Sequence, residues 1–151
     1  MSTKAKLLIG AGLLSAMGIA GCATVEEAVV EGTANTYRAT LTGAQEPGGG
    51  DPDGTGRAEV SIADKADQIC YDVNDVRNIG PITSAHIHRG APGQNGPIVF
   101  TFKLANEGGF KGCASRSEWL EDRIEANPTA YYVNLHNAEY PNGAIRGQLG
   151  R

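Results

Sequence analysis

Polar and hydrophobic residues alternate in several short segments of the chain, with the period of two that half-buried β-strands show. The alternation covers residues 37–42, 58–62, 69–73 and 133–136, while residues 98–102 are apolar throughout and residues 144–149 follow a Pro-Asn-Gly turn. Loops rich in glycine, proline and aspartate separate these segments at residues 48–56 and 90–97. The pattern predicts a small antiparallel β domain with tight turns.

One segment departs from this alternation and predicts a helix over about residues 115–127. Ser115 followed by Glu118 has the spacing of a capping box, and Ser117 is a competing N-cap. Trp119, Leu120 and Ile124 can share one face of this helix, and Pro128 ends it. A single short helix does not indicate an α/β fold, so the expected class is mainly β: a sandwich or a barrel-like domain.

The first residues have the pattern of an export signal. Lys4 and Lys6 precede an apolar stretch over residues 7–19, which is too short to span a membrane. The sequence Ile19-Ala20-Gly21-Cys22 resembles the bacterial lipobox. This resemblance implies cleavage before Cys22 and acylation, including palmitate, of the new terminus. An ordinary secretory signal with a chance cysteine is the alternative.

Cleavage there divides the chain into a signal peptide (1–21), an acylated cysteine with a tether (22–35) and a folded domain (36–151). Thirteen tether residues span about 20 Å as coil, which holds the domain just clear of a membrane surface. Ala23 after the cysteine, rather than aspartate, favours the outer membrane if the host has one, as the lipoprotein resemblance implies. We therefore expect a lipid-anchored protein of the cell envelope.

Net charge excludes one class of partner. The chain carries a charge of −4, and removal of Lys4 and Lys6 with the signal peptide leaves −6. No run or patch of lysine and arginine is present, which argues against a nucleic-acid partner. A protein or small-ligand partner is not identified by the sequence.

Two further cysteines, Cys70 and Cys113, are the available partners for a disulfide once Cys22 is acylated. Export to an oxidising compartment favours their pairing. Two buried thiols, or half of a metal site, are the alternatives, although neither cysteine has a second cysteine or a histidine at ligand spacing.

The candidate chemistry lies in the three histidines. His86 and His88 are two residues apart, so on a strand they project from the same face. Asn134 and His136 likewise share the face opposite Val133 and Leu135. If the two strands are neighbours, the three imidazoles converge and suit one copper or zinc ion with an open fourth position. Hydrogen-bonded histidines without a metal are the alternative.

Several of these motifs occur together in one known family. The sequences Ala85-His86-Ile87-His88-Arg89-Gly90, Tyr131-Tyr132-Val133-Asn134-Leu135-His136 and Ala144-Ile145-Arg146-Gly147-Gln148-Leu149 resemble the CHRD domain family over roughly residues 36–151. The resemblance implies an extracytoplasmic antiparallel β domain without a generally assigned activity. Many members have threonine after the last histidine, where this chain has Asn137. Arg146 lies in the signature, and we expect it to hold the structure or to contact an anion.

Other interpretations of the sequence are weaker. The His-x-His pair resembles the copper site of copper/zinc superoxide dismutases, but that complete site uses more histidines than the three present here. Asp51-Pro52-Asp53-Gly54 resembles the start of a calcium loop, without the ligands that should follow. Glu121 is expected to be a solvated charge. Two functions stay open: a non-enzymatic binding or structural module, and a copper or zinc protein that acts as carrier or small redox enzyme.

Overall fold

The computed structural model describes residues 34–63, 67–105, 109–115 and 118–151. The predicted signal peptide and nearly all of the tether lie outside these residues. Within them, no helix is both long enough and apolar enough to cross a membrane.

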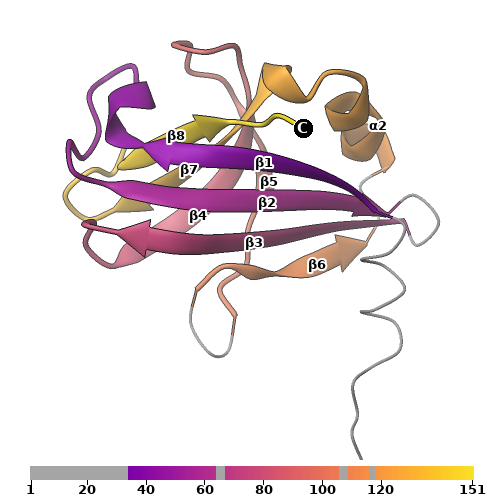
Figure 1. The fold of residues 1–151 in the computed structure, drawn as a ribbon, viewed down its shortest axis with the longest axis horizontal. Helices are drawn as coiled ribbons and strands as arrows, with labels where there is room; N and C mark the ends of the chain where they lie inside the picture. The colour runs from indigo at the N-terminus through magenta and orange to yellow at the C-terminus, as the bar shows by residue number, and fades with distance from the viewer. Residues whose placement is uncertain (1–33, 64–66, 106–108, 116–117) are drawn as a thin grey trace, which may run out of the picture.

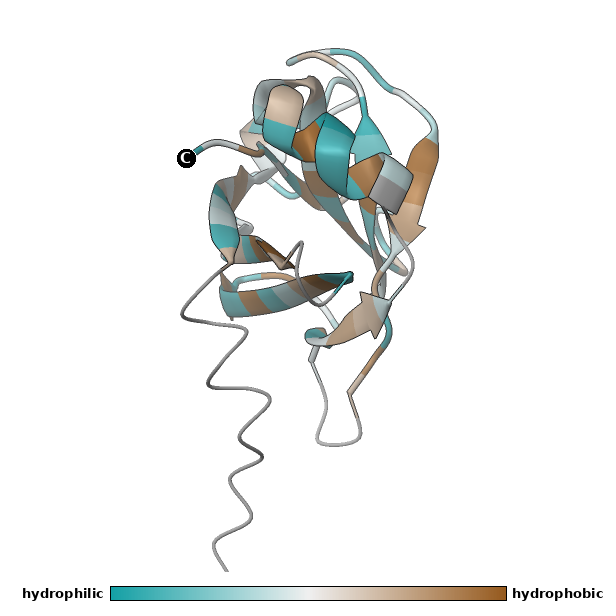
Figure 2. Cartoon of the chain, turned by 90° about the vertical axis from the view of Figure 1, so that its right-hand side faces the viewer, coloured by the Kyte–Doolittle hydropathy of each residue, from teal (hydrophilic) through white to brown (hydrophobic). Residues whose placement is uncertain are grey.

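Eight antiparallel strands form one sheet in the order β5-β4-β7-β8-β1-β2-β3-β6. The first four strands along the chain are β1 (Asn35–Thr42), β2 (Thr55–Ala63), β3 (Gln68–Arg77) and β4 (Ile82–Arg89). The last four are β5 (Ile98–Thr101), β6 (Lys111–Ser115), β7 (Tyr131–Asn137) and β8 (Ile145–Gln148). The sheet curls on itself like a half-barrel (Figures 1 and 2). The mainly β prediction is confirmed, in its barrel-like form rather than as two stacked sheets.

Alternation along each strand decides which side chains enter the core. In β1 the residues Tyr37, Ala39 and Leu41 are buried on the inner face, while the residues between them face outward. Brown and teal residues alternate along the strands in Figure 2 for this reason. The inner faces of the other strands supply the rest of one hydrophobic cluster, which includes Val60, Ile69, Ile87, Val133, Leu135 and Ile145.

In the described part of the domain, two 3-10 turns and one helix accompany the sheet: η1 (Gly43–Gln45), α2 (Glu118–Ala126) and η3 (Pro128–Ala130). Leu120 and Ile124 of α2 are buried in the core cluster, as the helical spacing predicts. Asn35 at the start of β1 donates a 2.5 Å hydrogen bond to Glu125, so the tether enters beside α2.

The helix differs from its prediction in three respects. Ser115 belongs to β6, where it pairs with Gln68, so the helix begins later than the proposed capping box. The competing N-cap, Ser117, lies outside the described residues. Trp119 is 56% exposed instead of sharing the buried face, because one residue of helix turns it about 100° away from Leu120. Glu121 was predicted to be solvated, but it is only 3% exposed.

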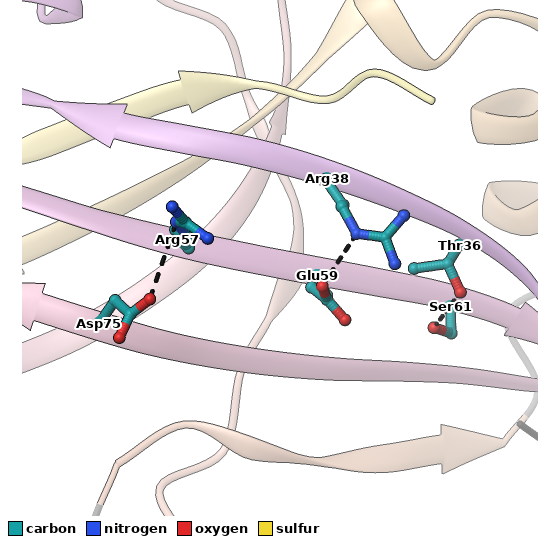
Figure 3. A network of polar contacts seen from close by, with 6 residues as sticks. All are labelled: Thr36, Arg38, Arg57, Glu59, Ser61 and Asp75. Carbon is teal, nitrogen blue, oxygen red and sulfur yellow. Dashed lines mark hydrogen bonds and ion pairs between the residues drawn. The ribbon is translucent and has the colours of Figure 1, made fainter.

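The outer face of β1, β2 and β3 is solvated and carries cross-strand pairs. Arg38 of β1 pairs with Glu59 of β2, and Thr36 lies 2.9 Å from Ser61 on the same two strands (Figure 3). At the edge of this half, Cys70 of β3 lies opposite Cys113 of β6, and the two form a disulfide. The predicted pairing of the two cysteines is therefore confirmed.

Candidate metal centre

Strands β4 and β7 are neighbours and bring the three histidines to one face. His86 lies opposite Asn134, and His136 lies opposite Ser84, so the two histidines form a diagonal cross-strand pair. Ile87 and Leu135 point the other way and are fully buried in the core. The strand period of two thus places His86, His88 and His136 together on the outer face.

The three rings converge as the sequence predicts. His86 Nδ1 lies 3.1 Å from His136 Nε2. One ring nitrogen from each histidine lies within 4.8 Å of the other two, and all three side chains are half-buried. Within the described part of the chain, this is the group of ligand-type side chains close enough to hold a metal ion.

Backbone carbonyls fix the protonation of two of these rings. His88 Nδ1 lies 2.9 Å from Gly96 O, and His136 Nδ1 lies 3.0 Å from Pro141 O. A carbonyl oxygen can only accept a hydrogen bond, so each Nδ1 carries the proton when the ring is neutral. The Nε2 atoms of both rings are then unprotonated. That of His88 is buried without a hydrogen-bond partner.

Electrostatics keeps the rings neutral. Burial, and then the neighbouring rings of His136 and His88, lower the pKa of His86 to about 4. Burial also lowers the pKa of His88 and of His136, although the carbonyls of Gly96 and Pro141 act in the opposite direction. Neutral imidazole is the form that binds metals, so the cluster is ready to act as a ligand near neutral pH.

The donor set and spacing fit a copper or zinc ion. Metal–nitrogen bonds of about 2.0–2.1 Å place tetrahedral ligand atoms about 3.3 Å apart. The His86–His136 separation of 3.1 Å already matches this value, and the widest pair, at no more than 4.8 Å, needs a movement of roughly 1.5 Å. Three imidazoles without thiolate or carboxylate suit either metal and leave a position open.

Around the histidines lies a buried polar group that the sequence indicated only in part. Asn134 and Arg146, both named from the sequence, are 3% and 1% exposed. Asn134 Nδ2 donates a hydrogen bond to Glu46 Oε1, and Arg146 donates one to Ala91 O. Burial raises the pKa of Glu46 to about 7, although Arg146 and Asn134 act to lower it.

Glu46 is the residue that sequence reasoning missed. It stands in a Gln-Glu-Pro-Gly turn, where a solvated carboxylate is the ordinary expectation. Its burial depends on the loop at residues 43–51 folding against β8, through the bond from Asp51 N to Ala144 O. No local motif signals such a contact.

The other candidate ion site lacks support. Asp51 Oδ1 accepts a hydrogen bond from the backbone N–H of Asp53, so this carboxylate closes a local turn. No calcium-type cluster accompanies it among the residues with described positions. The hairpin-loop interpretation of this segment fits the structure.

A curled antiparallel half-barrel with a three-histidine cluster on its outer face defines a small β domain with a candidate metal site. The CHRD domain family model matches residues 37–149, and the chain belongs to this family. No curated protein and no solved structure matches the chain. The family suggests an extracellular binding or structural module.

Proposed function

We propose that this CHRD domain is a non-enzymatic module that binds one copper or zinc ion through His86, His88 and His136. The observation that carries the proposal is the convergence of three ring nitrogens from two neighbouring strands. Two of the three rings direct their Nδ1 protons to backbone carbonyls, so both Nε2 atoms are unprotonated. His88 Nε2 has no hydrogen-bond partner, and His136 Nε2 lies 3.1 Å from His86 Nδ1, whose proton a metal would replace.

The arrangement favours a metal over simple hydrogen bonding. A structural role would satisfy the ring nitrogens with protein partners, because buried polar atoms without partners are costly. His88 Nε2 is buried and has none, whereas a metal ion would complete it. Burial of three adjacent imidazoles also depresses their pKa values, which favours the neutral ligand form.

We further propose that the domain is held at the cell envelope, and at the outer membrane if the host has one, by lipid on Cys22. The tether enters at Asn35, beside α2. Across the sheet, His86, Asn134, Arg146 and Thr42 lie in register, and Thr42 is at the far end of β1 from Asn35. Seven residues of strand correspond to about 23 Å. An anchor at Cys22 would therefore join the domain at the end of β1 remote from the histidines.

Metal titration tests the binding proposal. The metal-free lipidated protein in detergent is titrated with Cu²⁺ or Zn²⁺ at pH 7.5 in a calorimeter. We expect one equivalent to bind, and we expect binding to disappear in the triple variant His86→Ala, His88→Ala, His136→Ala. Thr101→Ala is the matched control, because Thr101 is an exposed neighbour opposite His86 on β5. Saturable binding that survives in the triple variant would refute the assignment.

Fractionation tests the anchor independently. Cys22→Ser should release the protein from the membrane fraction or leave it as uncleaved precursor, because serine cannot form the thioether. A mature form of this variant that stays in the membrane until detergent is added would contradict the proposed lipid.

A further inference from the structure

The three histidines differ in how firmly the protein holds them. The rings of His86 and His136 lie against other histidines, with centroids 4.9 Å apart. His88 instead stacks on Tyr132, with ring centroids 4.8 Å apart and planes inclined by 9°. Tyr132 lies directly opposite His88 in the β4–β7 register, and it is only 2% exposed.

Tyr132 is itself held from the next strand. Arg146 of β8 places its guanidinium carbon 3.3 Å from the centroid of the tyrosine ring. The same guanidinium donates a 3.0 Å hydrogen bond to Ala91 O in the loop after β4. Because β4 and β8 flank β7, His88 and Arg146 approach Tyr132 from its two sides. The phenol ring therefore has little freedom to rotate.

One residue, Gly96, links the tyrosine to the histidine through its two backbone polar groups. The Gly96 N–H donates to Tyr132 Oη at 3.2 Å, and Gly96 O accepts from His88 Nδ1 at 2.9 Å. A side chain at position 96 would place its Cβ 1.7 Å from Arg89 O, so only glycine allows the backbone to come so close here. Tyr132, Gly96 and His88 thus form a closed set of contacts.

We infer that Tyr132 is a positioning residue of the three-histidine site, where it holds His88 in one orientation and as the Nδ1–H tautomer. The functional role of Tyr132 rests on the proposed metal binding, whereas its contacts with His88 and Gly96 do not. His88 would present Nε2 from a ring held both by a carbonyl and by stacking, whereas His136 has a carbonyl partner without the tyrosine. Outer contacts of this kind raise metal affinity because they fix the ligand before binding.

The test begins with the metal-free, full-length protein in detergent micelles and needs no metal. Nitrogen-15 spectra at pH 8 should show His88 as a single Nδ1–H tautomer. Tyr132→Leu should give a mixture of tautomers of His88. The variant removes the ring on which His88 stacks and the hydroxyl that accepts the Gly96 N–H. Tyr131→Phe is the matched control, because Tyr131 is buried on the inner face and belongs to the core cluster. A mixture in the unaltered protein, or one tautomer retained in Tyr132→Leu, would overturn the inference.

Affinity and amide exchange complete the test. Tyr132→Leu should weaken Cu²⁺ binding about 10- to 100-fold, as loss of an outer partner does. Tyr132→Phe keeps the ring but removes the acceptor, so Gly96 N–H should exchange faster with deuterium. This second variant decides the matter if Tyr132→Leu does not fold, and unchanged Gly96 exchange would contradict the inference. Absence of metal binding by the unaltered protein would refute the proposed function alone, since the tautomer measurement stands without it.

Discussion

The outer face of the sheet has two halves that treat polar residues differently. On β1, β2 and β3 the pairs are open to solvent: Arg38 and Glu59 lie 2.9 Å apart with side chains 63% and 42% exposed. Arg57 and Asp75 are 3.7 Å apart and still more exposed. Figure 3 shows these pairs lying across the strands. Such pairs contribute little to stability, because water competes for each charge.

On β4, β7 and β8 the same outward positions are covered. Asn134 and Arg146 are nearly inaccessible, at 3% and 1% exposed. The backbone of the loop at residues 90–97 provides hydrogen-bond acceptors for His88, Arg146 and Gln148. Polar groups taken out of water need specific hydrogen-bond partners. The side chains of this half are therefore held in fixed positions, whereas those of the solvated half are not. The comparison teaches that alternation decides which way a residue points, whereas the loops decide whether it is available for chemistry.

The solvated half has one place where a change should cost much stability. Replacing both cysteines, as Cys70→Ser with Cys113→Ser, should lower the free energy of unfolding by about 4 kcal/mol, because the closed loop restricts the unfolded chain. The cysteines are 43 residues apart. Urea denaturation measures the effect, and a loss below about 1 kcal/mol would show that the unfolded chain gains little freedom.

The next largest effect is expected in the covered half. Arg146→Ala should destabilise the domain by about 3 kcal/mol, because it removes a buried charge together with its stacking on Tyr132. Glu46 would lose its nearby positive charge, and the pKa of Glu46 should rise further. Denaturation and carboxylate infrared titration measure the two effects. A variant as stable as the unaltered protein would contradict the distinction between the halves.

Acid should weaken the covered half specifically. The pKa of His86 is about 4 in the folded protein and about 6.5 in the unfolded chain. The contribution of His86 to the free energy of unfolding is therefore complete above pH 6.5 and is lost as the pH falls toward 4. Glu46 acts in the opposite direction: its contribution is present below pH 4.5 and is lost as the pH rises through 7.

Comparing the unaltered protein with His86→Gln separates these two opposing effects. Both proteins contain Glu46, so the difference in their unfolding free energies isolates the histidine. Between pH 6.5 and 4, we expect the unaltered protein to lose more unfolding free energy than His86→Gln. The change in this difference should be smaller than the effect of Arg146→Ala. A difference that stays constant over this range would show that His86 titrates normally.

The smallest effect is expected from the solvated pairs. Arg38→Ala should change the free energy of unfolding by less than about 1 kcal/mol, since its pair with Glu59 is exposed. Denaturation of Arg38→Ala beside Arg146→Ala compares two arginines of one sheet. Equal losses of unfolding free energy in the two variants would contradict the difference between the solvated and the covered half.

The sequence was sufficient to predict the elements that depend on local pattern. Alternation around Tyr37, Val60 and Tyr71 located three strands, and the two-residue spacing of His86 and His88 placed them on one face. The disulfide followed from the count of available cysteines. Each of these features depends on neighbours in sequence or on simple elimination.

Other features could not be predicted because they depend on contacts distant in sequence. Strand β6, Lys-Gly-Cys-Ala-Ser, has no large apolar residue, so its pairing with β3 gives no periodic signal. Closure of the sheet into a half-barrel depends on strand order, which the local pattern does not specify. The burial of Glu46 and Glu121 depends in the same way on which segments pack nearby.

The most direct test of the central claim is X-ray absorption spectroscopy of the copper- or zinc-loaded protein. Our account predicts three imidazole nitrogens at about 2.0–2.1 Å from the metal and one oxygen ligand from solvent. The imidazole signal should fall to two in His136→Ala, since β7 supplies one of the three rings. A shell with one imidazole or none in the unaltered protein would show that the converged histidines do not form the metal site.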